Sequence, residues 1–468
     1  MTPLLTTAVA VALLLATPAH AQNSARQEPP PQPSASSTKP FLAIQEVKSP
    51  GGITAWLVED HTLPIISLTF SFKEAGSARD PRDRQGLARM VSNTLDEGAG
   101  NLDSQAFQKA LSDHSISLSF SANRDDLVGS LKTLTRHQDK AFDLLHLALT
   151  QPRFDQEAID RMRAANISRI RSSMTEPEWI AARFLNDLSY GDHPYALNSG
   201  GTITSLTAIS RDDLAGFVSN NLSRNRLLIG ATGNITPEKL ALVLDQVFSA
   251  LPATSATQTL KDTSIDHLGQ TYLYAKDIPQ SIIQMVQPGL DIKDPDYYAA
   301  YVMNYILGAS GFGSRLTEEI REKRGLTYGI YSSIFDMDHT NGFSVGLSTE
   351  NKNVAEALRL IRTEIKKMQD HPVSAQELNE AQSYIVGALP LSFSSTAAIS
   401  SHVLGLQQDE WPMDYYDHFP ARIRAVTAAD IQRVARRLLT PDRMLTVIVG
   451  QPEGVETQPL PTTLPNVE

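Results

Sequence analysis

The chain contains no cysteine among its 468 residues. Disulfide bonds and thiolate zinc sites are therefore excluded, and a folded chain must be held by its core. After the first 21 residues, no stretch approaches the roughly 18 consecutive apolar residues that a membrane-spanning helix needs. Positive charge is also scarce, because 41 Lys and Arg stand against 52 Asp and Glu, for a net charge of −11. This balance disfavours a general nucleic-acid-binding or anionic-membrane surface.

The first 21 residues have the pattern of a secretory signal peptide. An apolar run over residues 8–16 is followed by Pro18 and by Ala19-His20-Ala21, a small-x-small cleavage pattern. The segment before the apolar run lacks Lys and Arg, so a retained N-terminal anchor stays open as the alternative. Residues 22–39, rich in Pro, Gln and Ser, predict a flexible tether. A large exported protein without disulfides is typical of the bacterial periplasm, which is where we expect this one.

The remaining sequence predicts an α+β fold, because strand and helix patterns do not alternate strictly. Alternating or continuous apolar runs predict strands over residues 53–58, 64–72, 117–122 and 126–131. Helical periodicity is present over residues 84–97, 104–113, 139–150, 155–172 and 178–188. The polar stretch 252–264 is the best internal linker. It separates a first domain, residues 40–251, from a second domain, residues 265–452, and residues 453–468 predict a flexible tail.

The two domains share a repeated pattern. Residues 208–214 open a helix that leads to the strand 226–233, and residues 425–431 open a helix that leads to the strand 443–450. Both helices begin with Ser or Thr followed three residues later by Asp, close to a capping box. Both ends of the second segment lie at the same offset from the first, which indicates a duplicated domain. A chance match of two ordinary helix–strand units is the alternative.

The helix expected near residues 84–97 has an unusual polar face. Arg89, Ser92 and Asn93 stand at positions i, i+3 and i+4 and so share one side of the helix. A metal-hydrolysis helix of the H-x-x-E-H type needs His, Glu and His at this spacing. Here the three positions hold neither a metal ligand of that type nor a base. No two of the eleven histidines lie within five residues of each other, so we expect no metal site in this chain.

Residues 311–328 form the segment richest in candidate polar chemistry. A glycine-rich turn precedes an amphipathic helix, which ends at Gly325 before an aromatic strand begins. Arg321 on the last helical turn and Tyr328 at the start of the strand lie seven positions apart, which can direct a cation and a phenol to one spot. The alternative is a surface arginine beside a tyrosine packed at the domain edge.

Several segments together resemble the insulinase/pitrilysin-type peptidases, or inverzincins, in their short bacterial and mitochondrial-processing-peptidase-like form. The most specific is the run Phe312-Gly313-Ser314-Arg315-Leu316 through Arg321-Glu322-Lys323-Arg324-Gly325-Leu326-Thr327-Tyr328. Weaker ones are Glu74-Ala75-Gly76-Ser77, Gly86-Leu87-Ala88, Tyr190-Gly191-Asp192-His193-Pro194-Tyr195 and Gly233-Asn234-Ile235-Thr236. The resemblance covers nearly all of residues 41–452.

The resemblance implies two homologous α+β domains, each a mostly antiparallel sheet with helices packed on one face. Active members carry the H-x-x-E-H helix in the first domain, where this chain has Arg89, Ser92 and Asn93. Members contribute an arginine and a tyrosine from the second domain to a partner's zinc site, and Arg321 and Tyr328 match that pair. We expect Arg89 to occupy the space of the absent metal and to pair with a carboxylate that the sequence does not identify.

The expected function is that of a non-catalytic, peptide-binding subunit of an exported heteromeric zinc metallopeptidase. It would be an inactive homologue by itself, with zinc present only in an H-x-x-E-H partner subunit, and with Arg321 and Tyr328 reaching the peptide substrate across the interface. A peptide-binding or assembly protein with no enzymatic partner is the alternative from another class. A zinc enzyme with displaced ligands is the third.

Overall fold

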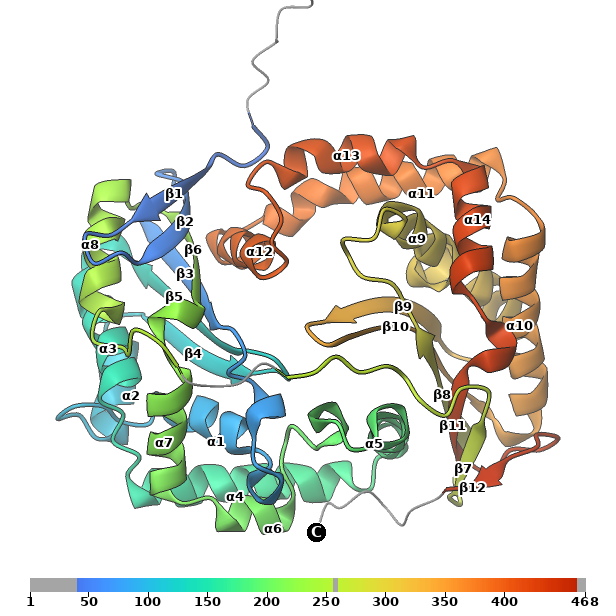
Figure 1. Ribbon diagram of the computed structural model, residues 1–468, viewed down its shortest axis with the longest axis horizontal. Coiled ribbons are helices and arrows are strands. Elements are labelled where there is room, and N and C mark those ends of the chain that lie inside the picture. Colours follow the sequence, from blue (N-terminus) through green and yellow to red (C-terminus); the bar gives the residue numbers. More distant parts are fainter. Residues whose placement is uncertain (1–39, 256–259, 461–468) are drawn as a thin grey trace, which may run out of the picture. The chain divides into compact units, whose positions relative to one another are not determined.

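The structure, a computed structural model, describes residues 40–255 and 260–460 (Figure 1). The predicted signal peptide and tether, residues 1–39, lie outside the described residues. The described chain contains two six-stranded sheets and fourteen α-helices, an α+β architecture as the sequence predicted. Within these ranges, no helix combines the length and the apolar character that crossing a lipid bilayer demands.

The first sheet is antiparallel except where β2 and β6 run parallel. Its order is β1 (Ile44–Lys48), β2 (Thr54–Glu59), β6 (Leu227–Gly233), β3 (Ile65–Phe72), β5 (Leu127–Leu134) and β4 (Ser117–Ala122). β3 and β6 are buried almost throughout, whereas β4, at the edge, alternates between buried and exposed residues. β4 therefore leaves one side without a strand partner among the described residues.

The second sheet repeats this topology in five of its six strands. Its order is β12 (Gln458–Pro459), β7 (Thr271–Ala275), β11 (Leu445–Gly450), β8 (Gln280–Pro288), β10 (Thr340–Glu350) and β9 (Ile330–Met337). β7 and β11 run parallel, as β2 and β6 do, and β9 takes the edge position of β4. The repeated strand order confirms the predicted pair of homologous domains. β12 comes from within the segment 453–468, and it pairs with β7.

The helices follow the sequence patterns closely. The part of the chain that contains the first sheet, called the first half below, has α1 (Leu87–Thr94), α2 (Ser104–Asp113), α3 (Gln138–Thr150), α4 (Gln156–Ser173), α5 (Pro177–Tyr190), α6 (Ile203–Ala208), α7 (Arg211–Asn221) and α8 (Pro237–Phe248). The second has α9 (Tyr297–Asn304), α10 (Val354–Asp370), α11 (Ala375–Ala388), α12 (Thr396–Gln408), α13 (Tyr415–Ala425) and α14 (Ala428–Leu438). Both capping boxes form, with Ser210 and Asp213 at α7 and with Thr427 and Asp430 at α14.

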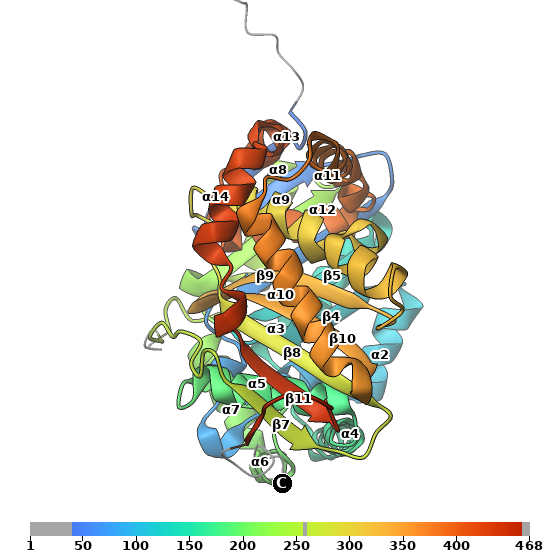
Figure 2. The ribbon, with the colours of Figure 1, turned by 90° about the vertical axis from the view of Figure 1, so that its right-hand side faces the viewer.

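One face of each sheet carries most of its helical cover. In the first half, α3 and α8 pack on the sheet through Phe142, Leu145 and Phe248, which join Phe70 in one core (Figure 1). In the second half, α10 lies across the sheet through Val354, Leu358 and Ile361 (Figure 2). These apolar contacts supply the hydrophobic stabilisation that a chain without disulfides requires.

The two halves exchange one helix each. α5, from the first half, buries Ile180, Phe184 and Leu188 in a cluster with Ile282 and Val447 of the second sheet. α12, from the second half, lies on β3 and β6 of the first sheet. The α5 contact is apolar. The α12 contact is made by small, polar side chains such as Thr396 and Ser400. The sequence did not predict this exchange, because each helix resembles an ordinary local segment.

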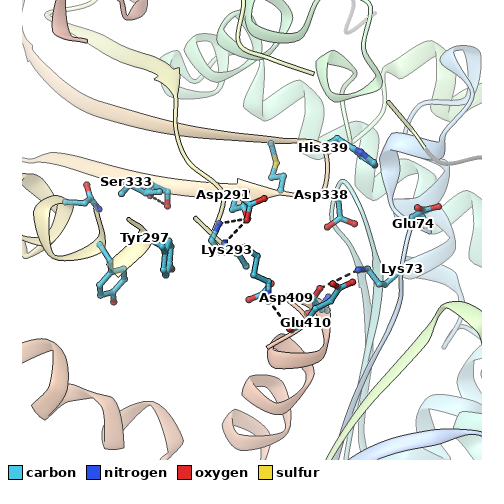
Figure 3. Close-up of a pocket in the computed structure, with 17 residues that line it drawn as sticks. Lys73, Glu74, Asp291, Lys293, Tyr297, Ser333, Asp338, His339, Asp409 and Glu410 are labelled. Carbon is cyan, nitrogen blue, oxygen red and sulfur yellow. Dashed lines mark hydrogen bonds between the residues drawn. The ribbon is translucent and has the colours of Figure 1, made fainter. Parts of the chain in front are cut away.

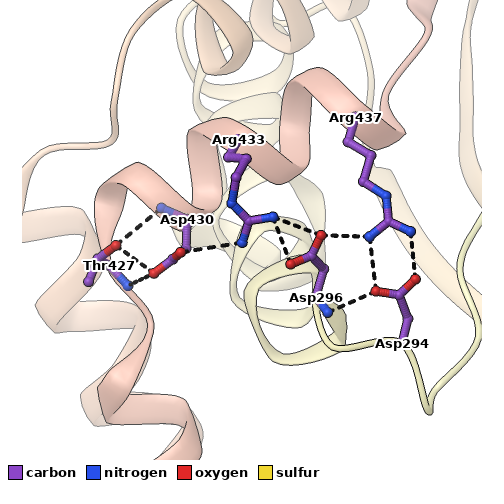
Figure 4. A network of polar contacts seen from close by, with 6 residues as sticks. All are labelled: Asp294, Asp296, Thr427, Asp430, Arg433 and Arg437. Atoms are coloured by element: carbon purple, nitrogen blue, oxygen red, sulfur yellow. Dashed lines mark hydrogen bonds and ion pairs between the residues drawn. The ribbon is translucent and has the colours of Figure 1, made fainter.

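A network of ion pairs fixes α14 against the start of α9 (Figure 4). Arg433 Nη1 lies 2.8 Å from Asp296 Oδ1, and Arg437 bridges Asp296 and Asp294 at 2.6 Å each. Hydrogen bonds from Arg437 hold the pKa of Asp294 below its ordinary value. Planar guanidinium groups that bind carboxylates at two points give such contacts geometric definition. This network therefore orients α14 on the outside of the second core.

Candidate functional site

The helix that resembles the family's zinc-binding helix is α1. Arg89 and Asn93 are half-buried one turn apart, whereas Ser92 is buried and its hydroxyl donates to the Arg89 carbonyl oxygen at 2.9 Å. Asn93 Oδ1 accepts a hydrogen bond from Asn166 Nδ2 of α4 at 3.1 Å, and Arg169 Nη1 donates to Asn166 Oδ1 at 3.2 Å. The structure thus places Arg89, Asn93, Asn166 and Arg169 where two helices meet.

This donor set does not fit zinc. Zinc in proteins is bound by thiolates, imidazoles and carboxylates, and none of the four side chains is one of these. The described residues contain no group of three or more His, Asp or Glu side chains that could hold a metal ion elsewhere. Within residues 40–255 and 260–460, Arg89 forms no ion pair with the carboxylate expected from the sequence, and the charge that acts on it is that of Arg169. No metal-dependent step can be derived for this helix.

Arg321 and Tyr328 are brought together in the second half. Arg321 lies in η8 (Thr317–Glu322), the π-helical part of the helix that the sequence predicted before Gly325. Its guanidinium carbon lies 5.2 Å from the centre of the Tyr328 ring, and Tyr328 is 86% exposed. π-Helical turns occur often at functional sites because they redirect side chains. A cation and an accessible phenol therefore stand side by side.

The turn between the two residues is built by its backbone. Gly325 adopts a φ of +62°, and its N–H donates to the Arg321 carbonyl oxygen at 2.8 Å. Such a left-handed residue is favoured as glycine because a side chain there is strained. Thr327 Oγ1 then donates to the Ser348 carbonyl oxygen at 2.6 Å, which fastens the segment to β10. The backbone that leads to Tyr328 is thus held in place.

Arg315, in the same family-like segment, has a structural contact. Its Nε and Nη2 atoms donate to the two carboxylate oxygens of Glu377 at 2.8 and 3.1 Å. Burial opposes ionisation of Glu377, but the bonds from Arg315 and from the Ser374 backbone lower its pKa to about 2. Arg315 therefore fastens the start of η8 to the first turn of α11.

A cavity of about 670 Å³ lies between the two halves (Figure 3). Its wall combines the end of β3, the loop before α9, strand β9 and the end of α12, with Lys73, Glu74, Asp291, Lys293, Tyr297, Ser333, Asp338, His339, Asp409 and Glu410 among the lining residues. A second hollow of about 420 Å³ contains Tyr328 and Tyr331, and Ser333 lines both. Strand β9 thus connects Tyr328 with the larger cavity.

The two lysines that line the large cavity are both hydrogen-bonded to backbone carbonyl oxygens. Lys73 Nζ donates to the Gln408 carbonyl oxygen at 3.4 Å, and Lys293 Nζ donates to that of Glu410 at 2.9 Å. Both ammonium groups thus lie at the C-terminal end of α12, where the helix dipole favours cations. Partial loss of water in the cavity raises the pKa of Asp336 to about 6 and also raises the pKa of Asp409, although both residues are exposed. The cavity can accept polar or cationic side chains.

Sequence reasoning missed this cavity. Only Glu74 among its lining residues belonged to a recognised segment, and the others come from five separate parts of the chain. No spacing rule connects such residues, because their proximity results from the docking of α12 on the first sheet. The sequence feature that came nearest to marking the cavity is the alternation in β9, which exposes Tyr331 and Ser333 on an edge strand.

Two family models match the chain. Residues 66–202 match the model described as insulinase, peptidase family M16, and residues 208–385 match the model described as the peptidase M16 inactive domain. The boundary between the two matches lies N-terminal to the linker predicted at 252–264.

Similar proteins include both inactive and active forms by name. The non-peptidase homologue YmxG of Helicobacter pylori is 28% identical over 71% of this chain and 77% of its own length. The β-subunit of the Saccharomyces cerevisiae mitochondrial-processing peptidase is 23% identical over 75% of this chain and 79% of its own. A crystal structure named as the peptidase M16 inactive domain from Pseudomonas fluorescens superposes with a TM-score of 0.82 at 26% identity. That match covers 89% of this chain and all of the other.

Proposed function

The chain belongs to the insulinase family, peptidase family M16, and we propose that it is the non-catalytic, peptide-binding subunit of an exported heteromeric zinc peptidase. Its similarity to a non-peptidase homologue and to an inactive-domain structure agrees with the α1 helix, which lacks the zinc donors. The observation that carries the proposal is the pairing of Arg321 with the exposed Tyr328, in a chain whose α1 helix lacks the zinc donors.

The proposed role of the pair is stabilisation of negative charge on a peptide bond. A guanidinium and a phenol both donate hydrogen bonds, and such donors stabilise a carbonyl oxygen as it becomes an oxyanion. The hydrolytic chemistry itself would come from the zinc of an H-x-x-E-H partner subunit, which supplies the activated water. Arg321 and Tyr328 would then act across the subunit interface.

Peptide binding is supported by the edge strand β9. An edge strand offers unpaired backbone groups to which an extended peptide can add as a further strand. β9 carries the exposed Tyr331 and Ser333, and it runs from the hollow at Tyr328 to the large cavity. A peptide along β9 would have Tyr328 near one end and the cavity's carboxylates near the other.

The test is reconstitution with a zinc-bearing H-x-x-E-H homologue. The purified chain alone should contain no stoichiometric zinc and cleave no peptide, and the mixture should cleave. Arg321→Ala and Tyr328→Phe should each lower kcat of the mixture by about 10²- to 10³-fold, as loss of an oxyanion donor does.

Two control substitutions lie close to the pair or share its chemistry. Arg324→Ala removes an arginine of the same turn that is held by Glu319, and Tyr384→Phe alters a tyrosine that is 62% exposed on α11. Both should leave kcat nearly unchanged. Full activity of the Arg321 and Tyr328 variants would overturn their assigned roles. Co-purification of the native chain without any zinc-bearing homologue would favour a peptide-binding or assembly protein that has no enzymatic partner.

The export proposal has its own test. Residues 1–21 carry the signal-peptide pattern, so periplasmic fractions should contain a chain that begins after Ala21, as N-terminal sequencing would show.

A further inference from the structure

The junction of α1 and α4 contains two arginines without a counter-charge. Arg89, on α1, is half-buried, and its Nε atom is buried without a hydrogen-bond partner. Burial and then the nearby charge of Arg169 lower the pKa of Arg89. Among the residues that the structure describes, no carboxylate forms an ion pair with either guanidinium. Other arginines on α4 do find one, since Arg161 pairs with Glu97 and Arg163 with Asp160.

This arrangement is costly for the folded chain by itself. A guanidinium withdrawn from water loses hydration, and a second cation nearby adds repulsion. An exposed arginine is satisfied by water, but the buried Nε of Arg89 is not. Residues that break a local rule of stability without compensation tend to lie at functional sites. The missing component is an anion.

The position of the two arginines indicates which anion. Arg169 is exposed and bonded to Asn166, so one cation reaches solvent while the other, Arg89, is half-buried. α1 also packs against β4, the edge strand of the first sheet. β4 is an edge strand like β9, so a part of the bound peptide that reaches β4 would bring a carboxylate towards α1. Guanidinium groups match carboxylates in shape and in hydrogen-bond geometry, so two of them form a strong receptor.

We infer that Arg89 and Arg169 form a carboxylate-binding site at the place where active members of the family bind zinc. The ligand is a carboxylate of a bound peptide, either its free C-terminus or an Asp or Glu side chain, and in this respect the inference rests on the proposed peptide binding. The degenerate helix has thus exchanged a cation-binding function for an anion-binding one.

The first experiment uses a small carboxylate and no peptide. Thermal unfolding of the full chain is measured in sodium glutarate and in sodium chloride at equal ionic strength. Glutarate should raise the melting temperature of the natural chain, since a ligand that binds only the folded state stabilises it. Arg89→Gln and Arg169→Gln should abolish that rise. Arg171→Gln, which removes an exposed arginine of the same helix, should retain it.

The same variants give a second readout without ligand. Arg89→Gln should melt above the natural chain by about 1–3 °C, because it removes an unpaired and partly buried charge. Equal glutarate responses in the natural chain and in both site variants would overturn the inference. A lower melting temperature for Arg89→Gln without glutarate would also count against it, since it would show that Arg89 has a stabilising partner.

The second experiment uses peptides and separates the two proposals. Substrate peptides of the reconstituted mixture are compared as free acids, as C-terminal amides, and as amides with an added Glu. The free acid should bind about tenfold tighter than the plain amide, the worth of one charge-assisted contact, and Arg89→Gln should remove the difference. If instead the Glu-containing amide alone regains affinity, the side chain is the source of the carboxylate.

Failure of each proposal has its own signature. Peptides that bind and are cleaved equally as free acids, as plain amides and as Glu-containing amides would overturn the carboxylate site and leave the proposed function standing. A glutarate response that depends on Arg89, in a chain that binds no peptide and restores no cleavage, would leave the anion site and overturn the proposed function.

Discussion

At the scale of single residues, two arginines of the segment 311–328 have different surroundings. Arg315 is held by both oxygens of Glu377, whereas Arg321 lies over the ring of an exposed tyrosine. Sequence spacing alone marked the whole segment and did not separate the two. The separation depends on α11, which brings Glu377 to Arg315 from a position 62 residues along the chain.

The contact of Arg315 predicts a pH-dependent loss of stability. The pKa of Glu377 is lowered to about 2, so its ion pair stabilises the fold above about pH 4.5 and is lost as the pH falls towards 2. Arg315→Met should therefore lower the free energy of unfolding by about 1–2 kcal/mol at pH 7, with solvent screening allowed for. In urea denaturation, the gap to the natural chain should narrow between pH 7 and pH 3.

The control for this prediction is an exposed pair. Arg359 is 59% exposed and contacts Glu356 three residues before it on α10. Arg359→Met should change the free energy of unfolding by less than about 0.5 kcal/mol at either pH. Similar losses in the two variants would show that the Arg315 pair is no more than a surface contact.

At the scale of elements, the docking of α12 depends on small and polar side chains. Ser67 Oγ lies 2.8 Å from Thr396 Oγ1, and Thr69 Oγ1 lies 2.8 Å from Ser400 Oγ. Gly230 on β6 permits the close approach, because a Cβ atom there would stand 2.3 Å from the Ser400 carbonyl oxygen. α12 in turn carries part of the wall of the large cavity.

Gly230→Ala should therefore displace α12 from the first sheet. The added methyl group meets backbone atoms that cannot rotate away, so we expect a loss of about 2–4 kcal/mol in the free energy of unfolding. Gly405→Ala is the matched control within α12, because no heavy atom lies within 4 Å of its added Cβ. It should raise stability by about 0.5–1 kcal/mol, as alanine favours a helix interior. Urea denaturation of both variants checks the pair.

At the scale of the whole molecule, buried carboxyl groups set the response to pH. Burial raises the pKa of Asp96 and Asp126 to about 6, and that of Asp80 to about 8. A carboxyl group with a raised folded-state pKa binds its proton more tightly in the folded chain. The folded state is therefore favoured at low pH, and stability falls as the pH rises from about 4 through 6.

The expected outcome is a stability maximum on the acidic side of neutrality. Unfolding in urea at pH 5, 6.5 and 8 should require progressively less denaturant, as long as the acid-labile pairs remain ionised. Asp126, which accepts hydrogen bonds from Ser71 and Gln408, should contribute a measurable part of this slope. Asp126→Asn should flatten the profile between pH 4 and 6. A midpoint that rises steadily towards pH 8 would contradict the prediction.

The sequence by itself determined the local elements and their duplication. Apolar periodicity located the strands and helices, and capping residues such as Ser210 and Thr427 located the starts of α7 and α14, because these signals depend on neighbours along the chain. It also determined that α1 offers no zinc donors, since that follows from residue type. The roles of Arg321 and Tyr328 remain a prediction of the resemblance.

Only the tertiary structure decided which distant groups meet. The exchange of α5 and α12, the cavity between the halves and the unpaired arginines at the α1–α4 junction all join residues far apart in sequence. Burial is the physical reason. It fixes which polar groups lose water, and it therefore fixes which of them require a partner, such as the buried Nε of Arg89 that finds none in the described chain.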